Sequence, residues 1–146
     1  MKKINEFSLE QHEGEYNTWP LQSMLLRHGQ PTGLYLPGYE LLHQFVMVDG
    51  LYFFITDWDC PFEEMTHFIL VSPSMKKLAW RQLGGMYQSF LLCHLEVLDQ
   101  HRLHTYFADD RTYDIQIRPW GIPFIYPRIS LKRGPDEAWP AKPASG

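Results

Sequence analysis

The sequence of 146 residues is poor in cysteine, in positive charge and in long apolar runs. Its two cysteines, Cys60 and Cys93, are too few for a disulfide framework, and we expect separate thiols rather than a bridge. The net charge of −4 gives no sign of a basic surface, so we expect no nucleic-acid partner. No apolar run reaches the length of a membrane span, and no apolar signal segment follows Lys2 and Lys3. These absences predict a cytoplasmic protein without a membrane partner.

Common catalytic motifs are missing as well. The chain has no GxxxxGKS/T or GxGxxG phosphate loop, no GxSxG nucleophile turn, and no HExxH or paired CxxC metal motif. Its seven histidines include His94, His101 and His104, but zinc needs three or four convergent ligands, so surface imidazoles are the favoured interpretation. We expect no metal and no cofactor. A hydrolase-type enzyme that uses His94, Glu96 or nearby carboxylates is the least favoured of three functions.

Aromatic residues are abundant at 15% of the chain, and apolar residues make up 45%. This composition is typical of a globular protein and favours strands. Between residues 39 and 132, short apolar runs alternate with turn residues, and no helical period is present. The pattern predicts a mainly β, single-domain protein, an antiparallel β-sandwich or small barrel of about eight strands with a short N-terminal helix. The domain is expected to cover residues 1–133, followed by a flexible Pro/Ala-rich tail at 134–146.

The clearest local signal is Asp49-Gly50, which separates two apolar runs at residues 39–48 and 51–56. Asp-Gly between such runs predicts a β-hairpin with a type I′ turn. Both runs are apolar on both faces, whereas a strand with one wet face alternates. The hairpin is therefore expected to be central and covered by another layer, by a helix, or by a partner chain such as a second copy in a homodimer.

The segment NTWPLQSMLLRHGQP, residues 17–31, has two interpretations. As a helix over residues 18–28, it would carry Pro20 near its first turn and would stop at Gly29. As a strand, it would place alternate residues on one face, namely Trp19, Leu21, Ser23 and Leu25. The helix is slightly favoured, because Pro20 and Gly29 bracket it at the expected positions, and it would cover one face of the hairpin.

The stretch DWDCPFEEM, residues 57–65, sets four carboxylates and two rings between two apolar strands. A calcium loop is disfavoured because Pro61 interrupts the ligands and no glycine allows the sharp turn. Neighbouring carboxylates destabilise a Cys60 thiolate, which argues against a cysteine nucleophile. Two interpretations are left open: a solvated turn whose rings fold back onto the sheet, or a partner-binding surface. In the second, the binding residues are Asp57, Trp58, Asp59, Phe62, Glu63 and Glu64.

Two functions therefore stand ahead of an enzyme. The first is a non-catalytic protein-binding module of inhibitor or immunity type, which uses the acidic-aromatic loop to occlude a partner with a basic surface. The second is a β-barrel carrier of a small apolar ligand, with Phe45, Phe53 and Tyr113 lining its cavity. No segment matches a known family closely enough to name one.

Overall fold

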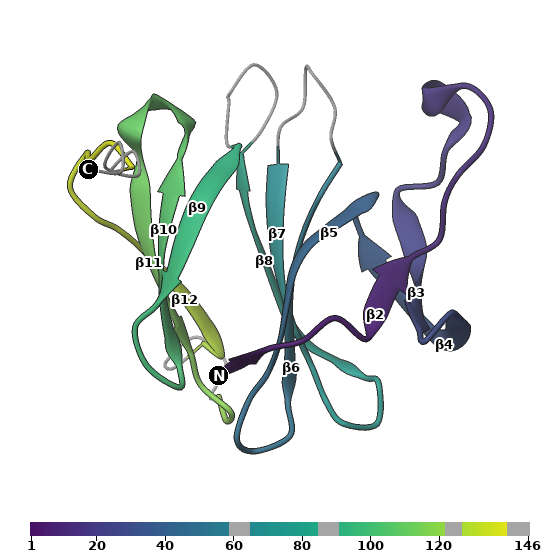
Figure 1. Cartoon of the computed structure of the whole chain (residues 1–146), viewed down its shortest axis with the longest axis horizontal. Coiled ribbons are helices and arrows are strands. Elements are labelled where there is room, and N and C mark those ends of the chain that lie inside the picture. The colour runs from purple at the N-terminus through teal and green to yellow at the C-terminus, as the bar shows by residue number, and fades with distance from the viewer. Residues whose placement is uncertain (59–64, 85–90, 122–126, 140–146) are drawn as a thin grey trace, which may run out of the picture.

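The computed structural model describes residues 1–58, 65–84, 91–121 and 127–139. Three antiparallel β-sheets lie side by side, with the largest sheet in the middle (Figure 1). The described residues contain 12 strands and two short 3-10 helices, η1 (Tyr16–Thr18) and η2 (Ala108–Asp110), and they contain no α-helix. The prediction of a mainly β, antiparallel fold is confirmed. The described strands number 12 in three sheets, against the eight or so expected, and no closed barrel is found among them.

The middle sheet has five strands in the order β1-β5-β6-β7-β8. Their bounds are β1 (Lys2–Lys3), β5 (Glu40–Val46), β6 (Tyr52–Asp57), β7 (Met65–Val71) and β8 (Lys77–Gly84). The second sheet contains β9 (Leu92–Val97), β10 (Arg102–Phe107), β11 (Thr112–Ile117) and β12 (Ile129–Arg133), with β12 at one edge. The third contains β2 (Phe7–Leu9), β3 (Gln22–Arg27) and β4 (Gln30–Pro37).

The centre of the middle sheet, β6 and β7, is buried on both faces, as the apolar pattern predicted for the run at residues 51–56. Phe53, Phe54 and Ile55 follow one another in β6, and all three are fully buried. Side chains alternate along a strand, so Phe53 and Ile55 pack in the core shared with the four-stranded sheet, while Phe54 packs in the core shared with the three-stranded sheet. The cover on each face is therefore another sheet of the same chain, and no helix takes part.

The expected N-terminal helix is wrong, and the strand interpretation holds in part, because Trp19 and Leu21 precede the strand and Leu21 is 69% exposed. Residues Gln22–Arg27 form β3, in which Ser23 and Leu25 are fully buried. His28 and Gly29 have φ angles of 49° and 80°, and Arg27 pairs with Gln30 across them. Two positive φ angles in a two-residue loop make a type I′ turn, and histidine enters this region more readily than most residues. Gly29 therefore turns a hairpin instead of ending a helix.

The hairpin between β5 and β6 is confirmed, but its turn differs from the type I′ turn expected. Only Gly50 has a positive φ, at 83°, and Asp49 does not. The Gly50 N–H donates to the Met47 carbonyl at 2.9 Å, and the Met47 N–H donates to the Leu51 carbonyl at 2.8 Å. This pattern is the three-residue loop in which a type I turn is followed by a left-handed glycine.

The C-terminal segment lies against the four-stranded sheet as far as the structure describes it. The Gly134 N–H donates to the Thr112 carbonyl at 3.0 Å, and the Thr112 hydroxyl donates to the Pro135 carbonyl at 2.7 Å. Further on, the ring of Trp139 stacks on His94 with centroids 4.9 Å apart. Residues 140–146 lie outside the described residues.

Two further findings concern the predicted compartment and thiols. Cys93, in β9, is a free and exposed cysteine, and Cys60 lies outside the described residues. None of the helices in the described parts of the chain has the length and hydrophobicity of a membrane span.

Candidate acidic-aromatic binding site

The first two residues of the predicted partner-binding loop, Asp57 and Trp58, are buried and half-buried. Asp57 is the last residue of β6, is 8% exposed, and accepts a backbone hydrogen bond from the Tyr39 N–H at 2.7 Å. Trp58 is half-buried, and its ring meets His67 edge to face at 4.9 Å. The other four predicted residues, Asp59, Phe62, Glu63 and Glu64, lie outside the described residues. The two described residues therefore lie against the middle sheet.

Trp58 forms one wall of a cavity of about 220 Å³. We call this cavity the acidic-aromatic pocket. Its lining residues come from the segment between β2 and β3, from the start of β5, and from the end of β6: Glu10, Gln11, His12, Tyr16, Trp19, Tyr39, Glu40 and Trp58. Five of the eight carry an aromatic or imidazole ring.

Four of these rings form a mutually contacting cluster. Trp19 and Tyr39 meet edge to face with centroids 5.1 Å apart, and Tyr16 meets Tyr39 in the same way at 5.8 Å. The His12 ring lies 5.4 Å from Tyr39 and 5.5 Å from Trp19. Edge-to-face pairs are favourable because the positive ring edge meets the negative ring face. A ligand that touches one of these rings is therefore close to the others.

Backbone contacts place the two central rings. The Trp19 indole N–H donates to the Glu13 carbonyl at 3.2 Å, which fixes the indole within its own loop. Tyr39 follows Gly38, whose φ of +108° few residues other than glycine adopt. A Cβ at Gly38 would lie 2.8 Å from the Asp57 carbonyl oxygen. A glycine is needed here because the chain crosses from β4 to β5 in close contact with the end of β6.

The hydrogen bonds of His12 define its tautomer. The Ser23 hydroxyl lies 2.6 Å from the Gly38 carbonyl and 2.8 Å from His12 Nε2. A serine has one hydroxyl hydrogen, and a carbonyl only accepts, so this hydrogen is donated to Gly38. His12 Nε2 therefore carries a hydrogen and donates it to Ser23. In the neutral ring, the Nδ1 atom is left as an acceptor.

The charged groups of the pocket are all negative. Glu10 and Glu40 line it, and among its described lining residues there is no lysine or arginine. The Glu10 side chain is held in place because its Oε1 accepts the Met24 N–H at 2.7 Å. Two carboxylates beside a half-enclosed ring surface make a region of negative potential.

His67 is the buried residue whose ring packs against Trp58. It is fully buried in β7, and its Nδ1 accepts the indole N–H of Trp80 at 3.1 Å. Burial lowers the pKa of His67 from 6.5 to about 4, so the ring is neutral at physiological pH. Its Nε2 atom has no hydrogen-bond partner within the part of the chain that the structure describes. His67 therefore contributes ring surface without charge.

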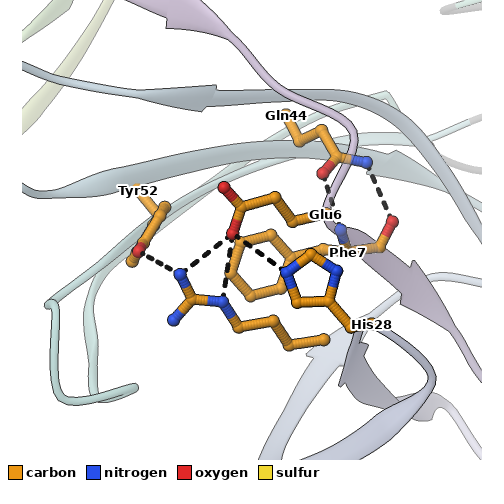
Figure 2. Close-up of polar contacts among 6 residues, drawn as sticks. Glu6, Phe7, His28, Gln44 and Tyr52 are labelled. Atoms are coloured by element: carbon orange, nitrogen blue, oxygen red, sulfur yellow. Dashed lines mark hydrogen bonds and ion pairs between the residues drawn. The ribbon is translucent and has the colours of Figure 1, made fainter.

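A second cavity, of about 330 Å³, adjoins the pocket. It lies between β2 and β5 and is lined by Phe7, Ser8, Leu9, Gln11, Tyr39, Glu40, Leu41, Leu42 and Gln44. The Gln44 side chain joins the two strands at one end: its Oε1 accepts the Phe7 N–H at 2.8 Å, and its Nε2 donates to the Phe7 carbonyl at 2.9 Å (Figure 2). The two cavities share Gln11, Tyr39 and Glu40 as lining residues and are therefore neighbours.

The barrel on which the carrier hypothesis depended is not formed, because the described strands divide into three open sheets. Phe45 and Phe53 are buried in the core between the middle and four-stranded sheets, and Tyr113 packs against that core. None of these three residues lines either cavity described above.

The residues considered for an enzyme lie together on one face of the four-stranded sheet. His104 pairs in register with Glu96 on one side and Asp114 on the other, and its Nδ1 lies 2.6 Å from Asp114 Oδ1. His94 lies 3.9 Å from Glu96, and Trp139 stacks on its ring. Within the described residues, no group of three or more His, Cys, Asp or Glu is placed to hold a metal ion. Neither of the two cavities described above includes these side chains.

Most residues of the pocket were missed by the sequence reasoning. The segment EQHEGEYNTW, residues 10–19, mixes three carboxylates with three rings, much as DWDCPFEEM does. That shared composition was the available signal, and it does not reveal that the two segments meet.

Comparison of the chain with protein-family models, with curated proteins and with solved structures gives no match.

Proposed function

We propose that this chain is a non-catalytic protein-binding module of inhibitor or immunity type that occludes a partner with a basic surface. The observation that carries the proposal is the acidic-aromatic pocket, in which five rings and two carboxylates gather without a lysine or arginine among the described lining residues. Rings supply contact area at a low cost in conformational entropy, and carboxylates supply charge complementarity.

The charge of the whole chain supports the same proposal. The net charge is −4, and the sequence places Asp59, Glu63 and Glu64 shortly after Trp58. A negative potential accelerates the encounter with a positively charged partner, and this effect weakens as salt screens it. We therefore expect a partner with a positive surface and a salt-dependent association rate.

The experiment compares the wild-type chain with two variants of equal net charge. One is Glu10→Gln/Glu40→Gln, because a glutamine side chain in place of Glu10 keeps a carbonyl acceptor for the Met24 N–H. The control is Asp49→Asn/Asp110→Asn, which neutralises two exposed carboxylates in hairpin loops away from the pocket. Each protein is immobilised, native lysate is passed over it, and the retained protein is identified and then titrated in purified form at several salt concentrations.

We expect a basic protein that binds the wild type and the control alike, and that binds the Glu10→Gln/Glu40→Gln variant roughly tenfold more weakly. The affinity of the wild type falls with added salt. Equal losses in both variants, an acidic partner, or retention of no protein would each overturn the proposal.

A further inference from the structure

The chain already holds one of its own cations between rings and a carboxylate. The Arg27 guanidinium carbon lies 5.3 Å from the Phe7 ring centroid and 5.5 Å from that of Tyr52. Its Nη2 donates to Glu6 Oε2 at 2.9 Å and to the Tyr52 hydroxyl at 3.1 Å (Figure 2). The hydrogen bond to Glu6 raises the pKa of Arg27, and burial opposes this in part. This arrangement shows which groups stabilise a cation in this protein.

The acidic-aromatic pocket gathers the same kinds of groups, and its described lining residues include no lysine or arginine. Trp19 and Tyr39 meet edge to face with centroids 5.1 Å apart, which is also the spacing of Phe7 and Tyr52, the two rings that contact Arg27. Glu10 and Glu40 supply carboxylates to the lining of the pocket, and Glu6 is the carboxylate that pairs with Arg27. A cation is attracted to such a site by the ring quadrupoles and by the carboxylates together.

We propose that the acidic-aromatic pocket binds the side-chain cation of a lysine or arginine that belongs to an extended segment of the basic partner. This inference rests on the proposed function and names the chemical group that the site recognises. The ammonium or guanidinium group lies against Trp19 and Tyr39, and Glu40 neutralises it.

The size of the pocket favours a single side chain. Its volume of about 220 Å³ is below the range of roughly 300–1,000 Å³ that is usual for pockets of drug-sized ligands and cofactors. A lysine or arginine side chain is long and narrow, and its methylene stem packs on rings while its head meets the carboxylates. The pocket alone is too small to enclose a nucleotide or a large apolar ligand.

The second cavity favours a cation that is part of a longer chain. It shares Gln11, Tyr39 and Glu40 with the pocket, and Leu41 and Leu42 add apolar surface. The partner residues next to the bound lysine or arginine can therefore occupy the second cavity.

Open strand edges flank this second cavity. Among the described strands, β2 is at the edge of its sheet, and β1 pairs with β5 only at Phe45 and Val46. Leu9, two residues after Phe7, directs its N–H and C=O to the same edge as Phe7, whose backbone bonds Gln44. An extended segment adds to such an edge through main-chain hydrogen bonds.

The test uses blocked heptapeptides whose central residue is lysine, arginine or norleucine, the uncharged counterpart of lysine. Binding to the full chain is followed by the indole N–H signals of Trp19 and Trp58 in NMR spectra. N-acetyl-lysine methylamide is a further arm, because it carries the cation without a flanking chain. The variants are Glu40→Gln and Trp19→Leu, and Tyr35→Leu is the control, because it removes an exposed ring of β4 that does not line the pocket.

We expect the lysine and arginine peptides to shift both indole signals and to bind at least about tenfold more tightly than the norleucine peptide. Glu40→Gln and Trp19→Leu should each weaken binding several-fold, while Tyr35→Leu should not. Glu40 is exposed, so its variant reports on the site even if Trp19→Leu impairs folding.

Equal binding of the norleucine peptide, or no shift with any peptide, would overturn the inference. A blocked lysine that binds as tightly as the heptapeptide would overturn the assignment to an extended segment. If the peptides fail while a basic protein is still captured, the inference falls and the proposed function stands. If the peptides bind and no basic protein is captured, the proposed function falls.

Discussion

The buried imidazole of His67 makes the stability of this protein depend on pH in a direction that the structure fixes. Its pKa falls from 6.5 in the unfolded chain to about 4 in the folded one, because burial disfavours the charged ring. Between these values the unfolded state binds more protons, so acid favours unfolding. The contribution of His67 to stability is complete above pH 6.5 and is lost as the pH falls toward 4.

The size of the effect follows from the shift. One pKa unit corresponds to 1.36 kcal/mol, and integrating the two titrations between pH 7 and pH 5 gives a loss of about 2 kcal/mol from His67. His43 is half-buried and its pKa is also lowered to about 4, first by burial and then by Lys3, so it adds to the slope of the wild type. The substitution that isolates His67 is His67→Gln, because glutamine does not titrate and keeps an acceptor for Trp80.

The assay is urea unfolding followed by tryptophan fluorescence and circular dichroism at pH values from about 5 to 7.5. The wild type should lose about 2 kcal/mol more than His67→Gln over the range from pH 7 to pH 5. The control is His28→Asn, which removes an imidazole whose side chain is 72% exposed and keeps a residue that tolerates a positive φ. The reasoning would be refuted if His67→Gln and the wild type showed the same dependence on pH.

Two further predictions concern the backbone of the pocket and the double-faced sheet. Gly38→Ala should lower the free energy of unfolding by about 2 to 4 kcal/mol, because its Cβ meets the Asp57 carbonyl, whereas Gly33→Ala, at a φ of +82° with nothing within 4 Å, should cost about 1 kcal/mol. Equal costs in thermal or urea unfolding would contradict the close approach at Gly38. Phe53→Leu and Phe54→Leu should each cost roughly 1 to 2 kcal/mol, and their costs should add within about 0.5 kcal/mol, because the rings lie in different cores. A large departure from additivity in the double variant would show that the two cores are coupled.

The strands were largely predictable from the sequence, and their partners were not. The consecutive apolar residues Phe53, Phe54 and Ile55 indicated that both faces of β6 are covered, because a single strand exposes alternate side chains to opposite faces. Periodicity gives the faces of a strand and contains no information on which sheet packs on each. The division into three sheets therefore had to come from the structure.

The error at residues 18–28 has a local cause. Gly29 ends helices and also turns hairpins, and its neighbour His28 adopts the positive φ that a two-residue turn requires. Pairing of β3 with β2 and β4 decides between the two outcomes, and β2 is separated from β3 by residues 10–21. Local propensity is overruled here by contacts within a sheet.

The binding site was only partly predictable for a similar reason. The sequence drew attention to Trp58 and its carboxylate neighbours, but the opposing rings come from residues 12–39. Their meeting depends on the crossing at Gly38 and on the hydrogen bond from Tyr39 to Asp57, which composition does not encode.

The five-stranded sheet also acts as a partition between two halves of the protein. The pocket belongs to the side of the three-stranded sheet, and the His104–Asp114 face belongs to the far sheet. Phe53 and Phe54 lie on opposite faces of this sheet, and each packs in a different hydrophobic core. Substitutions in the far sheet that keep its packing should thus leave the ligand preference of the pocket intact, which makes Cys93 a convenient position for a reporter dye.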